Sequence, residues 1–431
     1  MKRIGLGIIR VVFILTASNC AIGQSVNPKH ALDKALLAED LQAVQSAVES
    51  ARIFLGDKAG EPEVPDQYRP VPKQATLLTR AEAQLGFTAR FEELEKLSWW
   101  KIGLDPTKLS QPLRAPASVL VGNVAAVRAK LDGAEKSLAM ARRAADFLMW
   151  AQEQAGTGVY PFPAARGTSN DRAMEAATSF LSKAEKAGRI DEVVRNGWAG
   201  DDLGDGGLQF DNGECGIAIF QSFELTNDRR YLASANKATD WALSRPLCSN
   251  WNYNSFSVHL LAKAYAVTKN PRYLDGAILK ARIGVVPGQL TSGSHAGRWI
   301  DPHNARPAYH YIIMRALAQL VSVMPNDHPE FETMRNSLLL GLKCRNLEMV
   351  DRGIMNKDHA IETLIFVHHA FQGDTAFLTE SRTDDALNAI GRLVSEEWRR
   401  GKAPLGPGAM GLFLEYIATA LSVARFSDTP R

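Results

Sequence analysis

Glu224-Leu225-Thr226-Asn227-Asp228-Arg229-Arg230-Tyr231-Leu232 recurs 42 residues later as Ala266-Val267-Thr268-Lys269-Asn270-Pro271-Arg272-Tyr273-Leu274. Thr, Arg, Tyr and Leu stand at the same four offsets in both copies. In each copy, polar turn residues end one helix and the Tyr-Leu pair begins the next. Weaker copies are Met324-Pro325-Asn326-Asp327 before Phe331 and Gln372-Gly373-Asp374 before Phe377-Leu378. A two-helix unit that recurs at roughly 40–60 residues predicts stacked helical hairpins.

Helical periodicity surrounds this repeat along most of the chain. Apolar side chains at i, i+4, i+5, i+8 and i+9 mark one buried helix face at Phe256, Leu260, Leu261, Ala264 and Tyr265. Strand-like alternation is scarce. The 431 residues are 45% hydrophobic and 23% charged, which is an ordinary globular composition. The sequence therefore predicts an all-α protein.

The repeated turn, followed by a helix such as Ala233–Leu243, resembles the (α/α) toroids of glycoside hydrolases, polysaccharide lyases and sugar epimerases. Two further segments resemble helix-to-loop entries of those barrels: Ala145-Asp146-Phe147-Leu148 leading to Tyr160-Pro161-Phe162-Pro163, and Asp205-Gly206-Gly207-Leu208-Gln209-Phe210. The resemblance covers about residues 136–425 and includes no single family's full catalytic signature. It implies a ring of hairpins around a central cavity. An open solenoid of the same hairpins is the structural alternative.

The chain divides into three predicted parts. Residues 1–23 are typical of a secretory signal peptide, with Lys2, Arg3 and Arg10 before a short apolar run and small residues at the end. Residues 24–135 are expected to form a helical N-terminal extension, either a partial hairpin of the toroid or a separate cap. Residues 136–425 form the (α/α) toroid. The signal predicts a secreted or periplasmic protein.

Two features of the N-terminal region bear on anchoring and charge. Cys20 suggests a lipid anchor, but the residues before it lack the Leu and the Gly or Ala of lipidation signals, so anchoring there is disfavoured.

The 50 basic and 47 acidic side chains give a formal charge of +3. Removing the three basic residues of the signal leaves 47 of each, so the mature chain has no net charge. Any affinity for polyanions must come from a local cluster.

Cysteine content excludes a disulfide framework. Cys215, Cys248 and Cys344 would remain after cleavage, which allows at most one bridge among three pairings. Their spacing fits no zinc site. At least one is expected to be a small buried apolar side chain.

The segment from Trp198 to Glu214 is the first of three that concentrate polar residues. It carries Asp201, Asp202, Asp205, Asp211 and Glu214 among glycines that allow close backbone approach to a ligand. Glycoside hydrolysis needs one protonated and one ionised carboxyl beside the scissile bond. We assign Asp202 a catalytic role, and Trp198 and the other carboxylates substrate binding. Turn and capping chemistry explains the same composition, and a calcium site is a third reading although no EF-hand spacing is present.

The second segment, Asn250-Trp251-Asn252-Tyr253-Asn254-Ser255, alternates amides with aromatic rings before a helix. Flat rings stack on pyranose faces and amides bind hydroxyl groups, so we assign Trp251, Tyr253 and Asn254 to substrate binding. A helix N-cap with core aromatic side chains is the alternative. His259 follows in an apolar stretch and is expected to be a hydrogen-bonded core histidine rather than a catalyst.

The third segment, His295 to Tyr311, is the densest. β-Elimination of a uronate needs a group that neutralises the carboxylate, a base for the C5 proton and a donor to the leaving oxygen. We assign His303 as base and Tyr309 as acid, with Arg306 or Arg298 on the carboxylate; Asp301 could join the acidic segment in hydrolysis. Three further residues of the segment are assigned to substrate binding: His295, Trp299 and His310. The alternative is a rigid loop whose charged groups pair with one another.

These features favour a secreted carbohydrate-active protein, either a glycan-degrading hydrolase or a polysaccharide lyase. Its cleft would be lined by residues 198–214, 250–259 and 295–311, and its partner would be an oligo- or polysaccharide. A non-catalytic glycan-binding or envelope scaffold protein is the alternative. Secretion argues against a nucleotide-sugar epimerase. No phosphate loop, nucleic-acid motif or membrane span is visible, and a metal site from His295, Asp301 and His303 lacks an i, i+4 His pair, so no cofactor or metal is expected.

Overall fold

The computed structural model describes residues 28–62, 66–86, 114–155, 158, 160, 206–300 and 305–427. Helices dominate these ranges. The only β-pairing within them consists of two isolated antiparallel bridges, Arg69 with Ile354 and Gln289 with Trp299. The predicted all-α class is therefore confirmed. The predicted signal peptide at residues 1–23 lies outside the described residues and remains a prediction.

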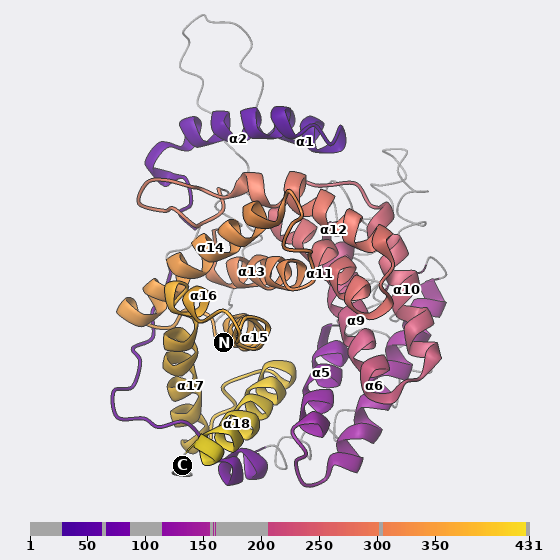
Figure 1. Ribbon diagram of the computed structural model, residues 1–431, viewed down its shortest axis with the longest axis vertical. Helices are drawn as coiled ribbons and strands as arrows, with labels where there is room; N and C mark the ends of the chain where they lie inside the picture. The colour runs from indigo at the N-terminus through magenta and orange to yellow at the C-terminus, as the bar shows by residue number, and fades with distance from the viewer. Residues whose placement is uncertain are drawn as a thin grey trace, which may run out of the picture.

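Six helices form a closed inner ring (Figure 1). In order around the ring they are α5 (Arg114–Arg128), α9 (Gly206–Thr226), α11 (Trp251–Thr268), α13 (Pro307–Val321), α15 (Asp358–Ala370) and α18 (Pro407–Ser427). Each contacts the next, and α18 contacts α5. This last contact confirms the toroid and excludes the open solenoid, in which the first and last hairpins do not meet.

Outer helices cover the ring and return the chain between inner ones. They are α6 (Ala134–Ala155), α10 (Arg229–Ser244), α12 (Pro271–Gly284), α14 (Phe331–Arg352), α16 (Thr375–Glu380) and α17 (Thr383–Arg399). Because the outer helices carry the chain back, the inner helices run in one direction. Gln209 and Gly216 of α9, for example, meet Ser257 and Leu260 of α11 in the same order.

The repeated turn explains how one hairpin leads to the next. The Thr226 hydroxyl donates to the Ser222 carbonyl 2.7 Å away and accepts from the Asp228 N–H, and Asp228 then caps α10 by accepting from the Arg230 N–H at 3.0 Å. Asn227 supplies the left-handed residue of the turn, with φ 55°. The second copy repeats these bonds at Thr268, Asn270 and Arg272, with Lys269 at φ 59°.

The tyrosine of each copy links neighbouring outer helices. Tyr231 of α10 donates to Asp146 of α6 at 3.1 Å, and Tyr273 of α12 donates to Asp240 of α10 at 3.0 Å. Both rings are buried. The motif therefore specifies the turn, the helix cap and the packing of one repeat against the previous one, which is why it recurs as a unit.

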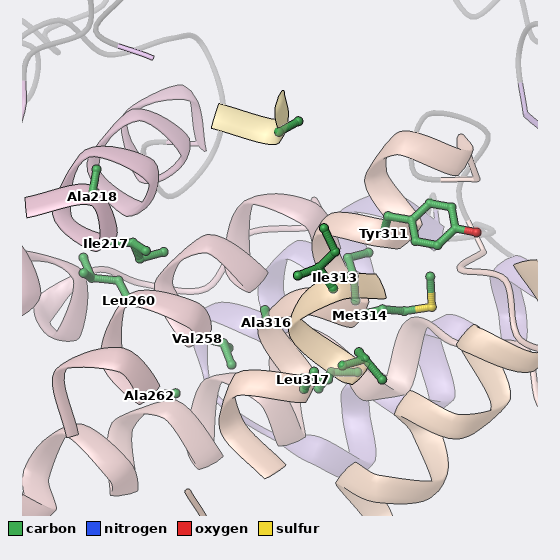
Figure 2. Packing of buried hydrophobic residues seen from close by; sticks show 14 of the residues in the cluster. Ile217, Ala218, Val258, Leu260, Ala262, Tyr311, Ile313, Met314, Ala316 and Leu317 are labelled. Atoms are coloured by element: carbon green, nitrogen blue, oxygen red, sulfur yellow. The ribbon is translucent and has the colours of Figure 1, made fainter. Parts of the chain in front are cut away.

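Apolar side chains fill the space between the inner helices. Figure 2 shows side chains from α9, α11 and α13 gathered in one cluster, among them Ile217, Leu260 and Met314. α11 buries residues on nearly all sides. A helix that is apolar all round belongs in the interior of a large fold, here between the outer layer and the ring axis.

The first helix of the inner ring, α5, lies inside the stretch 24–135 and contacts α6, α9 and α18. The division of the chain at residue 136 remains a prediction. Before α5, α1 (Pro28–Leu37), α2 (Leu41–Leu55) and η1 (Gly56–Lys58) lie outside the ring, at the top of Figure 1, where α2 contacts α12 and η3 (Val286–Gly288).

The N-terminal region also braces the ring from outside. Arg80 donates to the carbonyls of Ala129, after α5, and Ala418 of α18, across the junction of the first and last inner helices. Arg69 pairs with Glu397 of α17 at 2.7 Å. Residues that precede the ring in sequence therefore hold its two ends together.

In the described part of the chain, Cys215, Cys248 and Cys344 are not joined by a disulfide, and the first two are buried, as expected for small apolar side chains. Within the described ranges, no helix combines the length and apolar character that crossing a bilayer requires.

Ring closure depends on a glycine contact between α5 and α18. A Cβ at Gly411 would overlap the backbone of Gly122, and a Cβ at Gly122 would overlap the backbone of Pro407. The Ser118 hydroxyl accepts from the Gly408 N–H at 2.9 Å on the same seam. The two helices can approach this closely because neither has a side chain at the contact.

Gly411→Ala should therefore destabilise the fold, by about 1–3 kcal/mol, although alanine favours a helix over glycine. Urea denaturation followed by circular dichroism measures the change. Gly373→Ala is the matched control, because Gly373 has open space around it and no left-handed φ. Equal stability of the two variants would show that the seam is not tightly packed.

Candidate functional site

A cavity of about 590 Å³ lies on the axis of the ring. All six inner helices contribute to its wall. The polar side chains are Ser118, Arg128, Glu214, Gln221, His259, Lys263, Arg315, Gln319, Ser322, Glu362, His369 and Glu415. The apolar wall consists of Val121, Ile217, Ile365, Phe366, Ala370 and Leu412 with Gly408. A concave site with many apolar groups and convergent polar ones is typical of a small-molecule pocket.

The cavity deepens from the C-terminal ends of the inner helices towards their middle. Ser322 and His369, at the ends of α13 and α15, are exposed, and the Arg128 side chain at the end of α5 is 38% exposed. His259, in the middle of α11, is only 6% exposed. The mouth is therefore at the C-terminal ends, where the short repeated turns lie, and His259 and Arg315 are deep.

Arg315 organises the deep wall. Its guanidinium donates to Glu214 of α9 on one side and to Glu362 of α15 on the other, the latter at 2.6 Å. The Arg315 side chain is 11% exposed, so these ion pairs are largely shielded from water. Burial raises the pKa of Glu362, but the charge of Arg315 and a hydrogen bond from His359 outweigh burial and hold that pKa below 4.5. Glu362 is therefore ionised at neutral pH.

A second carboxyl on the same helix shows the opposite shift. Asp358 precedes Glu362 by one turn of α15, which places the two Cβ atoms about 6 Å apart. Burial raises the pKa of Asp358 above 3.8, the nearby charge of Glu362 raises it further, and the hydrogen bond from the Gly406 N–H at 3.0 Å only partly opposes this. Two neighbouring carboxyls thus have environments that separate their pKa values.

His259 is a neutral base in the deep wall. Burial, together with the charges of Arg315 and Lys263, lowers its pKa well below 6.5. An imidazole that stays uncharged at pH 7 can accept a proton or a hydrogen bond from a ligand. The sequence predicted a core histidine, and His259 is indeed buried, but it also lines the cavity.

Within the described part of the first predicted segment, residues 206–214, Glu214 lines the cavity. Asp211, one turn earlier on α9, pairs with Arg114 of α5 at 2.7 Å. Burial raises the pKa of Asp211 to about 6 despite that arginine. Arg114 also stacks on Phe210, 3.5 Å from the ring centroid. Four other predicted residues of this segment lie outside the described residues and remain predictions: Trp198, Asp201, Asp202 and Asp205.

The second segment caps α11 and packs into the core. Asn250 is the N-cap, and its side chain accepts from the N–H groups of Asn252 and Tyr253. Asn254 is fully buried and donates to the carbonyls of Cys248 and Gly284. The Trp251 side chain is buried. The structure therefore places Trp251 and Asn254 in packing between α11 and α12, away from the cavity lining.

The third segment divides between two places. Arg298 donates to Glu348 of α14 and to the Gly60 carbonyl, so it binds the outer layer to the N-terminal region. His295 lies 3.7 Å from Glu61 in the same area. Trp299 is fully buried, its indole donating to the Val285 carbonyl at 2.9 Å. None of these three residues lines the central cavity.

The rest of the third segment begins α13. Arg306 is the residue before the helix, and its guanidinium lies 5.8 Å from the Tyr309 ring centroid. His310 is fully buried and accepts from Arg345 of α14 at 2.7 Å. Asp301 and His303 lie outside the described residues, so the assigned base of an elimination stays a prediction. In the described part of the chain, no three His, Cys, Asp or Glu side chains are grouped to hold a metal ion.

Sequence reasoning missed most of the cavity wall. Arg315 stands in the run Ile312-Ile313-Met314-Arg315-Ala316-Leu317, and Glu362 in Ala360-Ile361-Glu362-Thr363-Leu364. A single charge inside an apolar helix is the available signal, because such a charge must find a partner in the interior. The predicted site residues lie instead in three segments rich in polar residues, 198–214, 250–259 and 295–311.

No protein-family model matches the chain, and no curated protein is similar to it. Among solved structures, the chain is similar to a polysaccharide lyase, with 14% identity, a TM-score of 0.48, and 82% of this chain and 99% of that one covered. It is also similar to a protein described as glycosyl hydrolase family 88 from Bacteroides vulgatus, with 12% identity, a TM-score of 0.48, and 80% and 98% covered. These are two of the enzyme classes that the sequence resembles. Likeness at this level assigns neither family nor activity.

Replacing Arg315 should destabilise the folded protein, because two carboxylates in the cavity wall lose the cation that pairs with them. Arg315→Met leaves Glu214 and Glu362 without their cation and is expected to lower the free energy of unfolding by about 3–5 kcal/mol at pH 7. The folded-state pKa of Glu362 is lowered, so its contribution is present above the unfolded value of 4.5 and is lost as pH falls through the folded value. The difference between the proteins should therefore shrink below pH 4.5.

Denaturant titrations at pH 7 and pH 4 measure the difference in unfolding free energy between the unchanged protein and Arg315→Met. Arg400→Met is the control, since Arg400 pairs with Glu396 on the surface with its side chain 64% exposed, and a change of about 0.5 kcal/mol or less is expected. A penalty at Arg315 that does not depend on pH would point to lost packing instead.

Proposed function

We propose that the chain is a carbohydrate-active enzyme, a glycoside hydrolase, that binds a saccharide in the central cavity. The observation that supports it best is the cavity of about 590 Å³ with the ionised Glu362 in its wall, together with Asp358, which lies one turn earlier on α15, outside the cavity lining, and whose pKa is raised. Paired carboxyl groups lie about 5–5.5 Å apart in retaining glycosidases and about 6.5–9.5 Å apart in inverting ones. The Cβ atoms of Asp358 and Glu362 are about 6 Å apart, and the side-chain conformations set the distance between their carboxyl groups.

The chemistry assigns one role to each carboxyl. Asp358, with the raised pKa, donates its proton to the glycosidic oxygen as the bond to the anomeric carbon breaks. Glu362, held ionised by Arg315, either removes a proton from the attacking water or attacks the anomeric carbon itself. In both cases the leaving oxygen departs as a hydroxyl and a water molecule supplies the new anomeric hydroxyl.

Other cavity residues suit the binding of a sugar. Gln221 and Gln319 carry amides that can both donate and accept hydrogen bonds. Phe366 offers a ring for the apolar face of a pyranose. The predicted signal peptide would bring this site to extracellular or periplasmic glycans, so localisation is part of the proposal.

A non-catalytic glycan-binding protein is the second candidate. It is favoured by one observation, that Arg315 already neutralises both Glu214 and Glu362. A carboxylate so firmly paired loses nucleophilicity and can serve to hold hydroxyl groups. The two candidates share the ligand and differ in turnover.

The test is turnover by the purified chain on neutral and acidic glycans, measured as release of reducing ends and as ultraviolet absorbance of unsaturated uronate. Hydrolysis raises the first signal alone. Glu362→Gln and Asp358→Asn should each lower the rate about 10²–10⁴-fold while saccharide binding persists, because both changes keep the side-chain shape and remove acid–base function.

Glu396→Gln is the control, since Glu396 lies on the surface at the end of α17 and pairs only with Arg400. Binding without turnover in the unchanged protein would replace the hydrolase with the glycan-binding candidate. Unsaturated products that disappear on replacement of His303 would instead support elimination.

A further inference from the structure

We propose that the saccharide bound in the central cavity is uncharged, so that neutral glycans and not uronates are the substrate class. This inference rests on the proposed function and narrows its substrate. Its basis is the pairing of every cation in the described cavity wall with a carboxylate.

The three cations of the wall occupy three depths, and each has a partner. Arg128, at the mouth, forms a two-pronged bond with Glu415 at 2.8 and 2.9 Å. Lys263 binds both oxygens of Glu224 at 2.7 and 2.8 Å. Arg315 binds Glu214 and Glu362, as described above. A uronate carboxylate would have to share a cation that already has a carboxylate partner.

Histidines do not supply the missing positive charge. Burial and two neighbouring cations lower the pKa of His259, and desolvation together with neighbouring His368 lowers that of His369. Both are neutral at pH 7. The three cations of the described wall therefore face four carboxylate partners, Glu214, Glu224, Glu362 and Glu415, so these groups together carry one excess negative charge.

The groups that remain without a partner match hydroxyls. The side-chain oxygen of Gln221 is a buried acceptor and Nε of Arg315 a buried donor, and neither has a hydrogen-bond partner within the described part of the protein. Buried polar atoms in this state call for a ligand or water. The oxygen of Gln221 needs a donor, which a hydroxyl group supplies and an ionised carboxylate does not. Nε of Arg315 can donate to either group.

A carboxylate would also be opposed by the wall itself. Glu214 and Glu362 both line the cavity beside Arg315, with side chains 23% and 15% exposed, and their negative charges repel a carboxylate that enters it. Leaving water for this site would therefore cost a uronate more than it costs the corresponding neutral sugar.

The experiment is calorimetric binding of the full chain to matched pairs of oligosaccharides. Each pair consists of an oligouronide from pectin, alginate or a glycosaminoglycan and the same oligomer after chemical reduction of its carboxyls. Neutral oligomers of cellulose, starch, xylan and mannan complete the panel. We expect at least one neutral ligand to bind and every uronide to bind at least tenfold more weakly than its reduced form, the size of a lost or opposed charged hydrogen bond.

Freeing a cation should reduce this preference. Glu415→Gln removes the carboxylate that pairs with Arg128 and is expected to increase the ratio of uronide affinity to neutral affinity about tenfold. Glu396→Gln, which frees Arg400 on the surface of α17, is the matched control and should leave this ratio unchanged.

Three outcomes count against the proposals and they are separable. Tighter binding of a uronide than of its reduced form overturns the uncharged substrate and leaves a saccharide-binding cavity. An unchanged ratio of uronide to neutral affinity in Glu415→Gln overturns charge pairing as the cause of selectivity and with it this inference. Absence of binding to every saccharide overturns the proposed function itself.

Discussion

The contact between α5 and α18 is the constraint on which the rest of the structure depends. Gly122 and Gly411 bring the two backbones together with no side chain between them, and this joins helices almost 300 positions apart in sequence. Only a closed ring encloses an axis. Polar groups on inner helix faces are then removed from water on all sides except at the mouth, and each must find its partner across the axis.

Charge pairing across the axis follows from that enclosure. Arg315 of α13 pairs with a carboxylate of the adjacent helix α15 and with one of α9, the next helix but one on the other side, so a single side chain links three inner helices. The same enclosure acts differently on Asp358, where burial outweighs the Gly406 N–H and the weaker effects of His359 and Lys357, and so its pKa rises while that of Glu362 falls. Differences in hydrogen-bond partners, rather than in depth, separate the two carboxyls.

The fold could be predicted because its determinants are local. Thr226, Asp228 and Tyr231 bond within the turn or to the adjacent repeat, so the motif carries its own structural explanation and its recurrence marks the period. The closed ring was predicted only from the resemblance to (α/α) toroids, because no local sequence pattern relates Gly122 to Gly411.

The site could be predicted only in small part. Dense polar loops are good candidates for function, yet polar side chains also anchor loops. Arg298 and His310 bond to α14, and Asn254 closes the turn before α11. Glu214 was found because it ends an acidic segment. Arg315 and Glu362 stand alone in apolar helices, and recognising them needs the helix phase and the identity of the inner face, both of which depend on closure.

The parallel orientation of the inner helices also affects the electrostatic potential at the mouth of the cavity. Because the inner helices run parallel, α5, α13 and α15 present their C-terminal ends at the mouth, where Arg128, Ser322 and Ala370 lie. The C-terminal end of a helix carries partial negative charge, which stabilises cations and disfavours anions within the last turn. Arg128 at this end is therefore stabilised by the backbone as well as by Glu415. An incoming carboxylate meets both that partial charge and the paired arginine, whereas a hydroxyl can bond to exposed carbonyl groups of the same turns.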